Sequence, residues 1–323
     1  MQMSSLTKRV ARVSVVTRLW PRSAQEREQG LVGYLFLLPD LIGLGVFWVA
    51  PMVFLFYLSL HEWTALSPMT YVGLQNFAEL MKDDLWWKSV RVTLVYLGSY
   101  MPLVVVLSLL LAVLLNTRIR ARNWFRTAFF VPYVIPTVIV GVIWAFMLDP
   151  SFGIVNYCFR QILQLPLLSQ LGWQLPNQMW LASTTMALPA IIFVDIWKYV
   201  GFCMIIFLAG LQEIPAQYYE AAMIDGANSW QLFRDVTVPL LRPVILFVVM
   251  ISAFRAFQVF DQVYVMTAGG PYYATYTMAF FIYERAFKFF RFGYAAAAST
   301  VLFVMILIFT IGQIRSLGTG AAE

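Results

Sequence analysis

The stretch of sequence that decides the fold runs from Ile214 to Pro243 and reads IPAQYYEAAMIDGANSWQLFRDVTVPLLRP. It is a polar insert between two long apolar runs, at 181–211 and 244–266. Most connections between helices are only a few residues long. A structured polar insert of this length therefore predicts a surface that a partner outside the membrane grips. The alternative is a solvated loop that merely joins two spans.

The composition on either side of the insert identifies a polytopic membrane protein. The chain is 61% hydrophobic and only 12% charged, whereas a soluble domain carries about 25% charged residues. A helix needs about 20 apolar residues to cross the hydrocarbon core, and spans of this kind must satisfy their own backbone polar groups. The expected fold is all-α, with six transmembrane helices at 33–60, 90–115, 127–148, 181–211, 244–266 and 294–314.

Basic residues orient the chain in the membrane. Six lysines and arginines precede Gly33, and four arginines lie in the 116–126 loop. The positive-inside rule places both termini, this loop and the 212–243 loop in the cytoplasm. The net charge of +6 is then a topology signal, and no nucleic-acid partner is expected, because no aromatic and basic binding fold accompanies the tail. We expect a cytoplasmic N-terminal tail, a transmembrane domain and a cytoplasmic C-terminal tail, at 1–32, 33–314 and 315–323.

Local signals within the insert predict a helix, a turn and a second helix lying across the inner face. Pro215 suits a first helical turn, the residues 217–224 are good helix formers, and Gly226 suits the left-handed residue that ends a helix. Asn228 or Ser229 can cap the second helix. We expect Pro239 to end the second helical segment.

The order and spacing of seven residues in the insert resemble the EAA loop of the permease subunits of binding-protein-dependent ABC importers: Glu220, Ala221, Ala222, Asp225, Gly226, Ala227 and Pro239. In that family the loop is the docking site of an ATPase subunit, and the resemblance implies a type I importer permease fold. It also implies that Glu220 and Gly226 form the core of the ATPase contact. Val236 and Val238 replace the more usual Ile and Leu and keep an apolar anchor.

Motifs outside the insert resemble the carbohydrate branch of this family, over roughly residues 33–314. The segment 71–77 is similar to its FVGLxNF segment, and 266–271 is similar to its LTGGGP turn, with Met266 and Ala268 departing from the pattern. Further matches lie at 195–198, 208–211 and 214–215. The resemblance implies import of a sugar or related polyol across the bacterial plasma (inner) membrane.

The energy source is expected to lie on other subunits. The chain has no G-x-x-x-x-G-K-[ST] phosphate loop, no metal-binding cluster and no nucleophile–base pairing, so we expect no cofactor, no metal site and no enzymatic activity in this chain. The resemblance implies a second homologous permease, two ATPase subunits that bind ATP and Mg²⁺, and an extracytoplasmic solute-binding protein. The external segments 61–89 and 149–180 are the expected docking surface for that protein.

Polar residues within the spans are the candidates for a substrate pathway, because ionisable groups in hydrocarbon are costly unless they are paired or face water. Asp195, Lys198 and Tyr199 share one helix face by their spacing. An Asp195–Lys198 ion pair that only fixes helix packing is the alternative. Arg255, Gln258 and Gln262 form a stripe at helical spacing, with Asp261 on a neighbouring face.

A third group of pathway candidates is aromatic. Tyr133, Thr137 and Trp144 are expected to share a face of the third span, which Pro132 and Pro136 can bend. Aromatic rings can stack on the apolar faces of sugar rings, although ordinary packing explains the same pattern.

Three other interpretations stay open at this point. Lys198 and Arg255 would also suit a glycerol-phosphate-type polyol, which the acids Asp195 and Asp261 disfavour. An ion-driven secondary transporter predicts broken spans and no docking loop. A membrane-embedded enzyme would need a convergent catalytic set, and the sequence shows none.

Overall fold

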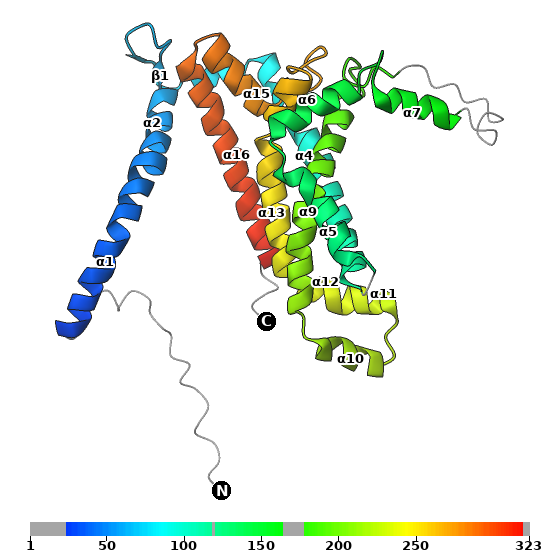
Figure 1. Ribbon diagram of the computed structural model, residues 1–323. Coiled ribbons are helices and arrows are strands. Elements are labelled where there is room, and N and C mark those ends of the chain that lie inside the picture. The colour runs from blue at the N-terminus through cyan, green and yellow to red at the C-terminus, as the bar shows by residue number, and fades with distance from the viewer. Residues whose placement is uncertain (1–23, 118–119, 164–177, 319–323) are drawn as a thin grey trace. The chain divides into compact units, whose positions relative to one another are not determined.

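The computed structural model describes residues 24–117, 120–163 and 178–318 (Figure 1). Most of the expected 1–32 tail and the end of the 315–323 tail lie outside these residues. Contacts divide the chain into two units, with the boundary between Leu55 and Phe56, and each unit is described by itself.

The first unit is a long apolar helix. It comprises α1 (Ala24–Leu44), a π-helical turn η2 (Gly45–Val49) and the start of α2 (Ala50–Ser59). The segment Gly33–Ser59 is long and apolar enough to cross a membrane, as expected for the first span. Helix α1 begins before this segment, inside the expected N-terminal tail.

The second unit is almost entirely helical, apart from two paired strands, β1 (His61–Glu62) and β2 (Thr70–Tyr71), which run antiparallel. Its helices in chain order are α3 (Gln75–Leu80), α4 (Asp84–Asn116), α5 (Arg122–Val134), α6 (Thr137–Met147), α7 (Ile154–Leu163), α9 (Ala187–Glu213), α10 (Ala216–Ile224), α11 (Ser229–Gln231), η3 (Leu232–Thr237), α12 (Val238–Leu240), α13 (Arg242–Phe257), α14 (Asp261–Met266), α15 (Met278–Tyr283), η4 (Glu284–Lys288) and α16 (Phe292–Gly318).

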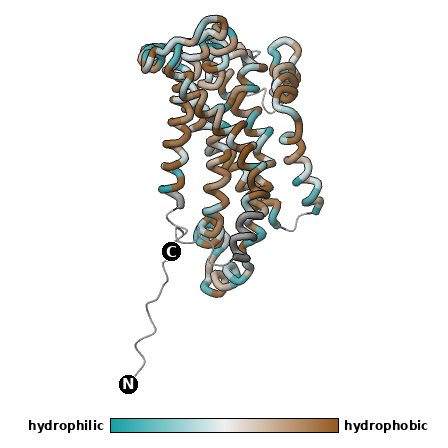
Figure 2. Tube along the Cα trace, turned by 90° about the vertical axis from the view of Figure 1, so that its left-hand side faces the viewer, coloured by the Kyte–Doolittle hydropathy of each residue, from teal (hydrophilic) through white to brown (hydrophobic). Residues whose placement is uncertain are grey.

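The described residues contain four straight candidate spans and two bent helix pairs. The bent pairs are α5 with α6, at 99°, and the run 229–240 with α13, at 70°. Counting each pair as one span gives the six that the sequence predicts. Figure 2 shows apolar residues along the long helices and hydrophilic residues gathered at the two ends of the second unit.

Helix α9 forms the centre of the second unit, because 67% of its apolar window is buried, against 28% for α4 and 33% for α16. It packs on α4, α5 and α13. Gly201 permits the close approach of α5, since a Cβ atom there would lie 1.8 Å from the carbonyl oxygen of Phe129. A helix that is apolar all round is expected in such a buried position.

The break between α5 and α6 has a local cause. Pro136 has no N–H to continue the helix, and Ile135 before it is extended, with ψ at 133°, as the residue before a proline tends to be. The expectation that Tyr133, Thr137 and Trp144 share one helix face is therefore wrong, because the 99° bend separates Tyr133 from the other two.

Two further expectations about helix boundaries need correction. The fifth span is not one helix over 244–266, because α13 ends at Phe257 and a short non-helical connection precedes α14. Pro239 does not end the insert's second helical segment, which continues through η3 and α12 to Leu240. The π-helical stretch directly before Pro239 accommodates its missing N–H.

The end of the second unit opposite the insert is tied together by Asp83. Its Oδ1 caps α4 by accepting from the N–H groups of Leu85 and Trp86, at 2.8 and 3.3 Å. Its Oδ2 accepts from the hydroxyl of Tyr294 at 2.8 Å and from Arg285 at 3.3 Å. One carboxylate therefore joins the start of α4 to η4 and α16.

Candidate functional site

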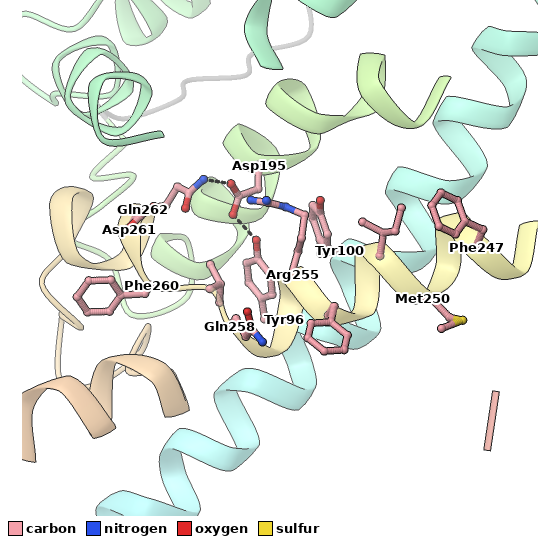
Figure 3. Close-up of a pocket in the computed structure, with 13 residues that line it drawn as sticks. Tyr96, Tyr100, Asp195, Phe247, Met250, Arg255, Gln258, Phe260, Asp261 and Gln262 are labelled. Carbon is pink, nitrogen blue, oxygen red and sulfur yellow. Dashed lines mark hydrogen bonds between the residues drawn. The ribbon is translucent and has the colours of Figure 1, made fainter. Parts of the chain in front are cut away.

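A cavity of about 500 Å³ opens among α4, α9, α13 and α14 (Figure 3). Its lining combines aromatic, aliphatic and polar side chains: Tyr96, Tyr100, Asp195, Phe247, Met250, Ile251, Phe254, Arg255, Gln258, Val259, Phe260, Asp261 and Gln262. Five of the ten predicted pathway residues lie here, namely Asp195, Arg255, Gln258, Asp261 and Gln262. The short connection between α13 and α14 brings them to one cavity although they do not share one continuous helix.

Asp195 lies at the inner wall of the cavity and is only 2% exposed. Its Oδ2 accepts a hydrogen bond from the hydroxyl of Tyr96, and its Oδ1 accepts one from the amide of Gln262. Both bonds are visible in Figure 3. Because each carboxylate oxygen already has a donor, Asp195 is anchored to α4 and α14 and holds these helices against α9.

Arg255 lies flat on the ring of Tyr199, with its Cζ 3.4 Å from the ring centroid. This is a cation–π contact. Among the described residues its side chain forms no ion pair and no hydrogen bond. It is exposed along the cavity wall, so the stack fixes the guanidinium plane and leaves the N–H donors at its edges unused.

Lys198 is directed away from the cavity, toward the break between α5 and α6. It is 2% exposed, and its Nζ donates to the carbonyls of Pro132 at 3.3 Å, Tyr133 at 3.2 Å and Ile135. These carbonyls end α5, where helical partners are missing. The Asp195–Lys198 ion pair considered above is not formed, because each side chain binds a different element.

The remaining predicted pathway residues pack against α9 rather than lining this cavity. Tyr133 stacks on Phe202, with ring centroids 4.4 Å apart. Thr137 Oγ1 lies 3.4 Å from the hydroxyl of Tyr199. Trp144 lies edge-on to Phe193 and Trp197, at 5.3 and 5.5 Å. A role for these residues in the pathway stays a prediction.

Sequence reasoning missed Tyr96 and Tyr100, which line the cavity from α4. Their rings stack at a centroid distance of 5.4 Å, and the hydroxyl of Tyr100 is buried without a hydrogen-bond partner. Two tyrosines four residues apart share a helix face, and this spacing within an apolar run was the signal available.

The polar insert forms a compact element at one end of the second unit (Figure 1). Helix α10 ends at Asp225, and Gly226 follows with φ at +85°, as its sequence predicts. Asn228 caps the second helix in a reciprocal capping box with Gln231, with bonds of 2.8 and 2.9 Å. The hydroxyls of Tyr219 and Thr237 lie 3.1 Å apart and join the two helices.

The seven residues of the EAA-like pattern lie on this element, and most of them are exposed. Glu220, Ala221, Asp225 and Gly226 are exposed, whereas Ala222, Ala227 and Pro239 are half-buried. A hollow of about 160 Å³ lies between the two helices, and Ala222, Asp225, Gly226 and Ala227 line part of it. Ile224 beside it is 87% exposed, which is unusual for an isoleucine in a structured helix. Their role in docking an ATPase stays a prediction.

Comparison with known proteins identifies the family. Residues 104–315 match the family described as binding-protein-dependent transport system inner membrane component. The chain belongs to this family. It is a transmembrane permease subunit of an ABC importer with the type I permease fold, and the residues that carried the resemblance in the sequence are confirmed as family signals.

Relatives and solved structures cover nearly the whole permease. It is 35% identical to a probable ABC transporter permease protein of Pyrococcus horikoshii, over 85% of this chain and 91% of the relative. It is also 35% identical to the trehalose/maltose transport system permease protein MalF of Thermococcus litoralis, over 88% and 92% of the two chains. A crystal structure of a bacterial ABC transporter involved in the import of the acidic polysaccharide alginate superimposes with a TM-score of 0.76 at 25% identity, covering 91% of the permease and 98% of that chain.

Proposed function

We propose that this permease carries a sugar or a related polyol across the plasma (inner) membrane. The observation that supports this best is the cavity among the spans, where the guanidinium of Arg255 and the amide of Gln258 stand beside aromatic rings. Sugars present hydroxyl groups around a ring with apolar faces, so they need both kinds of contact. Relatives named for trehalose/maltose, lactose and starch degradation products support the same substrate class.

The energy for transport comes from separate ATPase subunits that dock on the insert. Exposed Glu220 and Gly226, the small Ala221 and the nearby hollow form a surface that a groove on a partner can receive. ATP and Mg²⁺ are bound by those subunits. Among the described residues no group of three metal-binding side chains is present, which agrees with a chain that transmits motion and holds no metal.

The insert then defines the cytoplasmic end of the second unit. The end of α16 lies at the same end as α10 and α12 in Figure 1, which supports a cytoplasmic C-terminus. The basic residues before Gly33 favour a cytoplasmic N-terminus by the positive-inside rule.

The proposed assembly contains a second permease and a solute-binding protein. Phe247 and Phe254 beside the cavity are 53% and 48% exposed, and a homologous permease covering this side would bury them. The binding protein docks at the opposite end, on 61–89 and 149–180, of which 164–177 lies outside the described residues. The alginate transporter has also been solved in complex with an alginate pentasaccharide-bound periplasmic protein.

Two alternatives from the sequence are weakened. The bent spans agree with an ion-driven transporter, but the permease belongs to a binding-protein-dependent family. A glycerol-phosphate-type substrate loses one of its two expected cations, because Lys198 is bound to backbone carbonyls.

The test is purification of the tagged permease in mild detergent, followed by identification of the proteins that come with it. We expect a second permease and an ATPase, both lost or weakened when Glu220 and Gly226 are replaced. The reconstituted assembly with its binding protein should take up trehalose, maltose or lactose. A chain that purifies alone and imports no sugar would contradict the proposal.

A further inference from the structure

The cavity wall contains hydrogen-bond donors that the described structure does not use. The Arg255 guanidinium has no hydrogen bond or ion pair, and the Tyr100 hydroxyl is buried without a partner. A buried polar group without a partner costs about 1–3 kcal/mol, so such groups at one cavity point to a ligand that completes them.

These two groups lie close to one another. Arg255 interacts electrostatically with both Tyr100 and Asp195, and Figure 3 shows all three side chains at the same part of the cavity. The guanidinium offers five N–H donors in a planar fork, while a tyrosine hydroxyl can donate and accept. Because Tyr199 holds the guanidinium plane at 3.4 Å, little side-chain entropy is lost when its edge binds a ligand.

The charges of the lining argue against an anionic ligand. Asp195 and Asp261 carry two negative charges there, and Arg255 carries one positive charge. Lys198 is absent from the lining, and its Nζ is bound to carbonyls. A carboxylate or phosphate bound at Arg255 would add negative charge beside Asp195 in a site of low dielectric, where uncompensated charge is expensive.

We propose that Arg255, together with the Tyr100 hydroxyl, determines specificity by binding adjacent hydroxyl groups of an uncharged sugar. This rests on the proposed function and names the substrate class of the same cavity. The fork of Arg255 donates to two neighbouring sugar oxygens, and Tyr100 binds a third. Asp195 stays on Tyr96 and Gln262 and balances the charge of Arg255 without contacting the sugar.

The test measures weak sugar binding to the assembled importer in nanodiscs, with its partner permease and ATPases, by saturation-transfer NMR titration. The uncharged probes are trehalose, maltose and lactose, and the charged probes are glucuronate and glucose 6-phosphate. The variants are Arg255→Gln and Tyr100→Phe. Arg291→Gln and Tyr272→Phe are matched controls, because Arg291 pairs with Glu79 at the outer end and Tyr272 is 85% exposed.

We expect at least one uncharged sugar to bind more tightly than either charged probe. Arg255→Gln should weaken this binding about tenfold or more and Tyr100→Phe about threefold, as hydrogen bonds to charged and neutral groups respectively would. Both controls should bind as the unaltered permease does. Thermal unfolding of each variant identifies any loss that comes from misfolding.

Three results would overturn the assignment. One is preferred binding of glucuronate or glucose 6-phosphate, and another is unchanged sugar binding in both cavity variants. The third is no binding of any probe by an assembly that nevertheless imports sugar with its binding protein, which would leave the proposed function intact. An assembly that imports no sugar at all would instead remove the proposed function.

Discussion

The cavity and the cytoplasmic insert are built in opposite ways. In the insert, α10, Gly226 and the Asn228–Gln231 capping box follow from neighbours in the sequence. In the cavity, Asp195 meets Tyr96 and Gln262, which are 99 and 67 residues away along the chain. A locally determined surface can keep its shape while it moves as a unit. A cavity assembled from distant segments changes whenever those segments shift.

The comparison predicts its largest effect inside the helix bundle, at Lys198. Replacement by Met removes the donor that serves the carbonyls of Pro132, Tyr133 and Ile135. We expect a loss of about 2–4 kcal/mol in the free energy of unfolding, because buried acceptors are left unsatisfied. Thermal unfolding in detergent measures this. Lys288→Met, at a side chain that is 48% exposed, is the control, and equal stability of the two variants would contradict the bond assignment.

The next prediction concerns coupling at the insert. Gly226 has φ at +85°, a region that costs an L-residue about 1–2 kcal/mol, and no atom lies near its missing side chain. Gly226→Leu should therefore leave the fold in place, lower sugar uptake about tenfold or more, and leave sugar binding unchanged. Gly226→Asn is the matched control, because Asn tolerates this conformation.

Uptake and ATP hydrolysis are measured together in proteoliposomes. Loss of uptake with continued hydrolysis would support docking at Gly226. Normal uptake by the leucine variant would show that the insert is not the coupling surface.

A smaller effect is expected at the opposite end, where Asp83 joins α4 to η4 and α16. Asp83→Asn keeps an oxygen that can cap α4 but loses the charge that holds Arg285, whose side chain is 17% exposed. We expect a loss of about 0.5–1 kcal/mol, read from thermal unfolding. Asp84→Asn is the control at the neighbouring position. An effect as large as that of Lys198→Met would mean that this junction, and not the α5–α6 break, dominates stability.

The smallest effect is expected from the ion pair on the surface of the insert. The Arg234 side chain donates to Asp235 at 2.7 and 3.0 Å, and this bond holds the pKa of Asp235 below its ordinary value. A lowered pKa stabilises the fold above the unfolded pKa and loses that contribution as the pH falls through the folded pKa. Because both side chains are more than half exposed, solvent screens the pair. Acid titration of Arg234→Gln and of the unaltered permease should give unfolding curves that coincide within error.

Much of the fold was predictable because it depends on local chemistry. Apolar runs predicted the spans, and the glycine and capping signals predicted the turn of the insert. The exceptions have identifiable causes. Pro239 was expected to end a helix, but a π-helical stretch absorbs it. The fifth span breaks at Gln258, although its apolar pattern continues through the break.

The cavity was only partly predictable for the same reason. Ionisable residues in apolar runs indicated Asp195 and Arg255, because such groups are rare in hydrocarbon. Sequence could not distinguish the roles of Asp195 and Lys198, which lie three residues apart and bind different elements. Nor does spacing reveal that α4 brings Tyr96 and Tyr100 to the same place, since that depends on the packing of α4 against α9.

The bend that Lys198 caps limits which parts of the permease can move independently. If α5 and α6 straightened into one rod, the carbonyls would withdraw and leave an ammonium stranded in hydrocarbon. The contact of Gly201 with Phe129 fastens α9 to α5 by their backbones. We therefore expect α5, α6 and α9 to travel through the transport cycle as one rigid body. A covalent cross-link between α5 and α9 should leave uptake intact, and inhibition by it would show that they slide.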